Sequence, residues 1–68
     1  MDEDKLNMAV RKFLKMVGVS SQREIENAIT TALRNGTIKP DAKLDVTMTL
    51  KIDAVNLTHV IKDTLDLS

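Results

Sequence analysis

The sequence predicts an α+β fold with the element order ααββ(β), in which two antiparallel helices pack on one face of a small antiparallel sheet of two or three strands. Three observations lead to this prediction. Apolar residues recur with a helical period in the first half of the chain, Gly18 interrupts that half, and alternation of apolar and polar residues begins at Leu44. With 68 residues, the chain has room for one small domain, residues 1–68.

The first helix is expected over residues 2–17. Its apolar stripe is formed by Leu6, Val10, Phe13, Leu14 and Val17. Acidic residues stand at its N-terminal end and Lys12 and Lys15 lie toward the other end, which suits the helix dipole. Gly18 then offers a residue that accepts the left-handed conformation in which many helices end.

The second helix is expected to begin at Ser21. Ser21 and Glu24 have the spacing of a capping box, in which each side chain satisfies a free backbone donor. A narrow apolar seam follows, formed by Ile25, Ala28, Ile29, Ala32 and Leu33. Asn35 and Gly36 tolerate positive φ, so the helix should end there.

The second half of the chain is expected to form strands. Leu44–Ile52 alternates strictly and predicts a half-buried strand, and residues 53–56 predict a turn. A second strand should start at Leu57, and residues 62–64 allow another turn before a short third strand at residues 65–67. Residues 57–67 also fit a helix capped by Asn56. The strand is preferred because a long strand needs an antiparallel partner.

Composition excludes most kinds of active site. The chain has no cysteine and a single histidine, His59, so neither a disulfide nor the usual zinc sites can form. No close pair of carboxylates and no glycine-rich phosphate loop is present, and His59 has no evident catalytic partner. We therefore expect no enzyme activity, no metal and no cofactor. His59 should be structural or lie at an interface.

Charge and size point to interaction instead. Ten basic and ten acidic residues balance, which argues against a dedicated nucleic-acid binder. The acidic N-terminus is followed by no apolar run, so we expect a cytoplasmic protein without a membrane segment. A core this small rarely stabilises a domain alone, and oligomerisation is the remaining remedy. A homodimer or a complex with another protein is the expected state.

One surface is a candidate contact site. At about 100° per residue, one arc of the first helix gathers Lys5, Met8, Arg11, Lys12 and Lys15. Such an arc could meet an acidic protein or phosphates, so nucleic acid is the alternative partner. Residues 18–20 also resemble the turn of a helix-turn-helix, but the second helix would present acidic groups to the phosphates.

A family resemblance covers both helices. It is carried by Arg11-Lys12-Phe13-Leu14-Lys15, Val17-Gly18-Val19 and Ser21-Gln22-Arg23-Glu24-Ile25-Glu26. In these stretches the chain resembles a family of short bacterial proteins known only as a domain of unknown function. The strand region matches more loosely, and an Asp-Gly turn typical of the family is replaced by Lys62-Asp63-Thr64. The resemblance implies a shared fold and no assigned activity.

Overall fold

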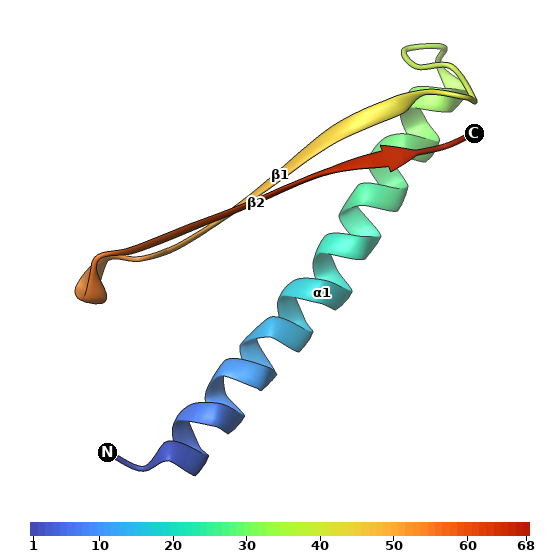
Figure 1. Cartoon of the computed structure of the whole chain (residues 1–68). Coiled ribbons are helices and arrows are strands. Elements are labelled where there is room, and N and C mark those ends of the chain that lie inside the picture. Colours follow the sequence, from blue (N-terminus) through green and yellow to red (C-terminus); the bar gives the residue numbers. More distant parts are fainter. The chain divides into compact units, whose positions relative to one another are not determined.

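A computed structural model describes the whole chain, residues 1–68, and has the element order αββ. Helix α1 spans Glu3–Arg34, strand β1 spans Lys43–Ile52, the one-turn 3₁₀ helix η1 spans Asp53–Val55, and strand β2 spans Leu57–Asp66 (Figure 1). The chain divides into two units, residues 1–37 with the helix and residues 38–68 with the hairpin. We describe each unit by itself.

The prediction of two helices is wrong, because α1 runs without a break through Gly18 to Arg34 (Figure 1). A glycine inside a helix costs only about 0.5–1 kcal/mol relative to alanine, which is too little by itself to end a long helix. Ser20 does not cap a new helix; its hydroxyl donates to the carbonyl of Met16 at 2.8 Å, as serines inside helices do. Ser21 likewise lies inside α1, so the expected capping box does not form.

The apolar stripe of α1 explains why the helix continues. Its positions are four, four and three residues apart and repeat every 11 residues, and all but Ser21 are apolar: Leu6, Val10, Leu14, Val17, Ser21, Ile25, Ala28 and Ala32. This repeat corresponds to about 3.67 residues per turn, so the stripe stays almost in line along a regular helix. The phase is kept across Gly18, and the two predicted seams are parts of one face. The helix-turn-helix interpretation is therefore wrong, because residues 18–20 lie inside α1 and form no turn.

Both ends of α1 are capped. The side chain of Asp2 accepts the backbone N–H groups of Asp4 and Lys5 at 3.0 and 3.1 Å, which satisfies two of the free donors of the first turn. At the other end, Thr37 N–H donates to the carbonyl of Ala32 at 2.9 Å, and Gly36 has a φ of 78°. These features form a Schellman ending. They confirm that the helix ends at Asn35-Gly36.

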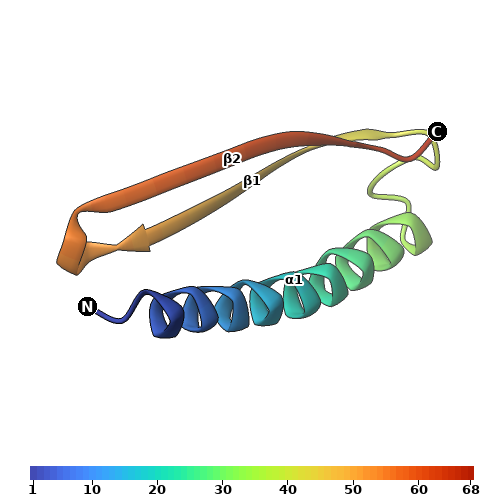
Figure 2. The ribbon, with the colours of Figure 1, turned by 60° about the horizontal axis from the view of Figure 1, so that its bottom comes forward.

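The hairpin is a two-stranded antiparallel sheet (Figure 2). Its register runs without a bulge from Lys43 opposite Asp66 to Ile52 opposite Leu57. The predicted turn is confirmed: η1 is followed by Asn56 in the left-handed region, with φ 56° and ψ 38°, a conformation that asparagine tolerates well.

The strand interpretation of the C-terminal segment is confirmed and the helical alternative is wrong. A separate third strand is also wrong, because β2 continues through residues 62–64 to Asp66. These residues lie opposite Asp45, Val46 and Thr47, so a turn at this point would leave half of β1 without a partner. No glycine or proline stands there to favour a turn.

Neither unit has a core of its own. No side chain is buried in α1, in β1 or in β2. A single helix has nothing to pack on, and an isolated two-stranded hairpin is marginally stable at best in water. The packed two-layer domain that the sequence predicts is therefore not found within either unit.

Candidate interaction surfaces

The register divides the hairpin into two faces of opposite character. Residues opposite each other in an antiparallel pair point to the same side, and side chains alternate along each strand. One side, here called the apolar face, carries eight apolar residues: Leu44, Val46, Met48, Leu50, Ile52, Leu57, Ile61 and Leu65. The ladder continues one step further, where Leu67 N–H donates to the carbonyl of Ala42 at 3.0 Å and adds two more apolar residues.

The other face of the hairpin is polar. Lys43 lies opposite Asp66, and Thr64 lies opposite Asp45 and donates its hydroxyl to that carboxylate at 3.5 Å. The remaining residues of this face are Thr47, Thr49, Lys51, Thr58, Lys62 and a single apolar residue, Val60. The polar face needs no cover in water, whereas the apolar face does.

The apolar face is partly open to solvent: none of its residues is buried, and of its eight apolar residues four are exposed and four are of intermediate exposure. Ile61 near the middle of β2 is 54% exposed, and Ile52 at the end of β1 is 47% exposed. Soluble proteins rarely leave a contiguous apolar patch of this kind uncovered unless it serves an interaction. The stripe of α1 is similar, since Phe13 and Leu14 are each close to half exposed.

Two polar residues interrupt the apolar face, and both belong to β2. His59 lies opposite Leu50, and Asp63 lies opposite Val46. They are four residues apart on one strand, which separates their Cα atoms by about 13 Å, so they cannot pair within the hairpin. The Asp63 carboxylate instead accepts the backbone N–H of Thr64 at 2.7 Å. From the sequence, His59 is expected to be structural or to lie at an interface, and no role is assigned to Asp63.

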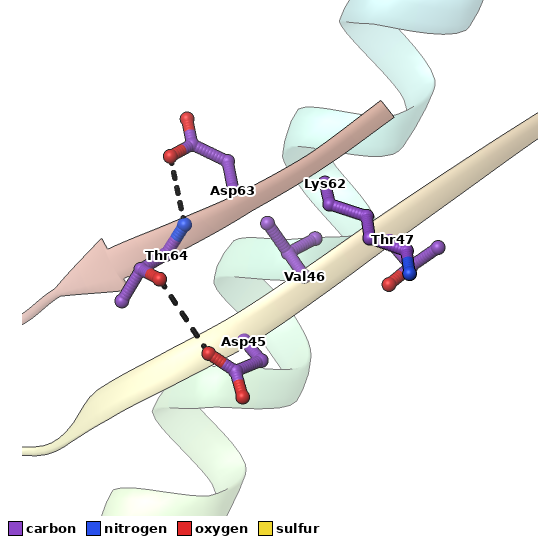
Figure 3. A pocket seen from close by; sticks show the side chains of 6 residues that line it. All are labelled: Asp45, Val46, Thr47, Lys62, Asp63 and Thr64. Carbon is purple, nitrogen blue, oxygen red and sulfur yellow. Dashed lines mark hydrogen bonds between the residues drawn. The ribbon is translucent and has the colours of Figure 1, made fainter. Parts of the chain in front are cut away.

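The hairpin also has a shallow depression of about 390 Å³ between the two strands. Figure 3 shows its lining, which consists of Asp45, Val46, Thr47, Lys62, Asp63 and Thr64. Thr64 links two of the lining carboxylates, because its backbone N–H donates to Asp63 and its hydroxyl donates to Asp45 (Figure 3). No histidine or cysteine lies in the depression.

The basic arc of the sequence lies within α1. Its members, Lys5, Met8, Arg11, Lys12 and Lys15, all belong to the first four turns and all are exposed. Helical geometry puts them on about a third of the circumference, opposite the stripe. Met8 is 72% exposed among these charges. An exposed apolar side chain is unusual on the charged side of an amphipathic helix.

The charged groups are also relevant as possible metal ligands and for shifts of their pKa. No three His, Cys, Asp or Glu side chains gather where they could hold a metal ion. The Asp66 carboxylate accepts one hydrogen bond from the hydroxyl of Ser68 and one from its backbone N–H. Both lower the pKa of Asp66 below its ordinary value, and the bond from the hydroxyl has the larger effect. Although α1 is long, no stretch of it is apolar enough to cross a membrane.

The chain belongs to a family of unknown function (DUF6494), whose model matches residues 1–68. The expected family membership is thus confirmed over the whole sequence. No curated protein and no solved structure matches the chain. The family carries no activity to transfer, so any function has to be argued from the surfaces described above.

Proposed function

We propose that this protein is a non-enzymatic interaction module that works as a homodimer, with its apolar surfaces covered by a second copy of the chain. The observation that carries the proposal is the apolar face of the hairpin, where eight of ten paired residues are apolar and none is buried. Such a face stabilises a fold only when something covers it.

The lengths of the elements support cover from outside the chain. Helix α1 has 32 residues and a length of about 48 Å, whereas the ten-residue strands are about 33 Å long. Helix α1 is therefore about 15 Å longer than either strand. Both strands of a two-stranded sheet are also edge strands, which natural proteins usually pair or cover. A second copy supplies both a further strand and a further helix.

Size-exclusion chromatography with light scattering at micromolar concentration tests this proposal. We expect a species of about 15 kDa, twice the 7.6 kDa of one chain, because the uncovered apolar faces favour association. A species that stays at 7.6 kDa up to about 100 µM would contradict the proposal, since the apolar faces would then be covered within one chain.

The basic arc supports a second candidate, binding of nucleic acid. Four cations on one side of α1 could contact phosphates, although the net charge of the chain is zero. The discriminating experiment compares duplex binding at 50 and 200 mM salt for the native chain and for Lys12→Glu/Lys15→Glu. Affinity that falls steeply with salt and is lost in the double variant would favour this candidate over the interaction module.

A further inference from the structure

The open edge of β2 is suited to pair with a second copy of itself. Leu67 donates to Ala42, its direct opposite, so the odd-numbered residues of β2 direct their backbone groups toward β1. By alternation, the even-numbered residues from Thr58 to Thr64 direct theirs to the open edge. One of these outward donors, Thr64 N–H, is held by the Asp63 carboxylate.

The pattern of side chains selects the register of such a pair. Two antiparallel copies of β2 join their apolar faces only if a residue, not a peptide bond, lies on the two-fold axis, because side chains alternate between faces. Near the middle of β2 the choices are Ile61 and Lys62. An axis at Lys62 would set two ammonium groups opposite each other, which is unfavourable, so Ile61 is the better choice.

An axis at Ile61 sets no like charges opposite each other, and Val60 lies opposite Lys62 of the second copy on the polar face. Leu57 then lies opposite Leu65 of the second copy, and Thr58 lies opposite Thr64. His59 lies opposite Asp63 of the second copy, and the same pair occurs twice by symmetry. The even-numbered residues that face the open edge are also the ones that would exchange backbone hydrogen bonds in this register. His59 and Asp63 would form a closer, non-hydrogen-bonded pair.

On the basis of the proposed dimer, we infer that two copies associate through the edges of β2, with Ile61 on the two-fold axis and His59 of each copy paired with Asp63 of the other. This arrangement gives a four-stranded sheet with one continuous apolar face, which exceeds the minimum of three strands for a stable sheet. Edge pairing satisfies the backbone groups of β2, and the wider apolar face is left to be covered by the other apolar surfaces of the two copies. The arrangement also gives the only carboxylate and the only imidazole of the apolar face a partner. In this contact Thr64 N–H would exchange its present acceptor, the Asp63 carboxylate, for a backbone carbonyl of the second copy.

The edge of β1 is the competing interface. Two copies of β1 with Met48 on the axis would also join apolar residues and would place Asp45 opposite Lys51. However, Asp45 and Lys51 lie on the polar face, where they are solvated and an ion pair contributes little. That arrangement leaves His59 and Asp63 unpaired on the apolar face, which is costly once the face is covered. The pairing of these two residues favours β2.

A pair of cysteine variants tests the choice of edge. The native chain has no cysteine, and Met48 and Ile61 lie opposite each other on the same face of one hairpin. We expect Ile61→Cys to form a disulfide-linked dimer under mild oxidation, because its two copies meet at the axis at a distance that a disulfide can span. Met48→Cys is the matched control and should stay mainly unlinked.

Each outcome of the cysteine experiment supports or contradicts the β2 edge as the dimer interface. Crosslinking of Met48→Cys alone, of both variants equally, or of neither would overturn the β2 interface. If the native chain still has the mass of a dimer in these cases, the proposed function stands and only the edge is wrong. If it is a monomer, both fail.

A charge exchange gives an independent test. His59→Asp sets carboxylates opposite each other twice and should weaken the dimer roughly tenfold or more. Adding Asp63→Lys should restore most of the affinity, because opposite charges again meet across the interface. The control Lys51→Asp should change the dissociation constant little. Loss of affinity in the control, or no rescue in the double variant, would contradict the inferred register.

Discussion

Replacing Gly18 by proline is expected to break α1 in its middle and to lower the free energy of unfolding by about 3 kcal/mol or more. Proline removes the N–H of residue 18 from the helical ladder, and its ring clashes with the carbonyl of Leu14, one turn earlier. The two halves of the stripe would then lose their common phase. Circular dichroism and urea unfolding measure the loss of helix and of stability.

The matched variant Gly18→Ala should have the opposite effect. A Cβ atom at this position would meet nothing within 4 Å, and alanine favours the helix over glycine by about 0.5–1 kcal/mol. We therefore expect slightly higher helicity and stability. If Gly18 ended a helix in the left-handed conformation, alanine would destabilise the chain instead, so a loss of stability would contradict a continuous α1.

Replacing Leu50 by aspartate is expected to destroy the dimer and to destabilise the hairpin by about 3 kcal/mol or more. Leu50 lies in the apolar face opposite His59, and a carboxylate covered there without a partner costs several kcal/mol. Its neighbour Thr49 lies on the polar face, so Thr49→Asp is the control and should cost at most about 1 kcal/mol, from strand propensity alone.

Equal effects of the two variants would contradict cover of the apolar face. Light scattering reports the mass and urea unfolding reports the stability of each variant. If Leu50→Asp stays dimeric with unchanged affinity, the apolar face is not covered in the dimer.

The hairpin was predictable from sequence because its signals agree with one another. Strict alternation in Leu44–Ile52 marks a strand with one apolar face, and Asn56 marks the end of a short turn. Together these fix the register, since a four-residue turn places Ile52 opposite Leu57. The third strand was wrong because residues 62–64 were interpreted by their polarity, although three polar residues in a row are compatible with a strand that is paired along its whole length, as β2 is with β1.

The helix was mispredicted at Gly18 because local signals were weighed above the longer pattern. Gly18 and the Ser21/Glu24 pair each suit a helix boundary, but the 11-residue repeat of apolar positions continues across them. The position of Asp63 on the apolar face was missed for a related reason. Its meaning depends on the phase of β2 beyond residue 62, and only the full register places it on the apolar face with His59.

The central claim is that a second copy of the chain covers the apolar surfaces, and the dependence of unfolding on protein concentration tests it most directly. A dimer that unfolds to separated chains gains about 2.7 kcal/mol of apparent stability when the protein concentration rises a hundredfold. We therefore expect the midpoint of thermal unfolding to rise clearly between 1 and 100 µM protein. A midpoint that is the same at both concentrations would contradict the central claim.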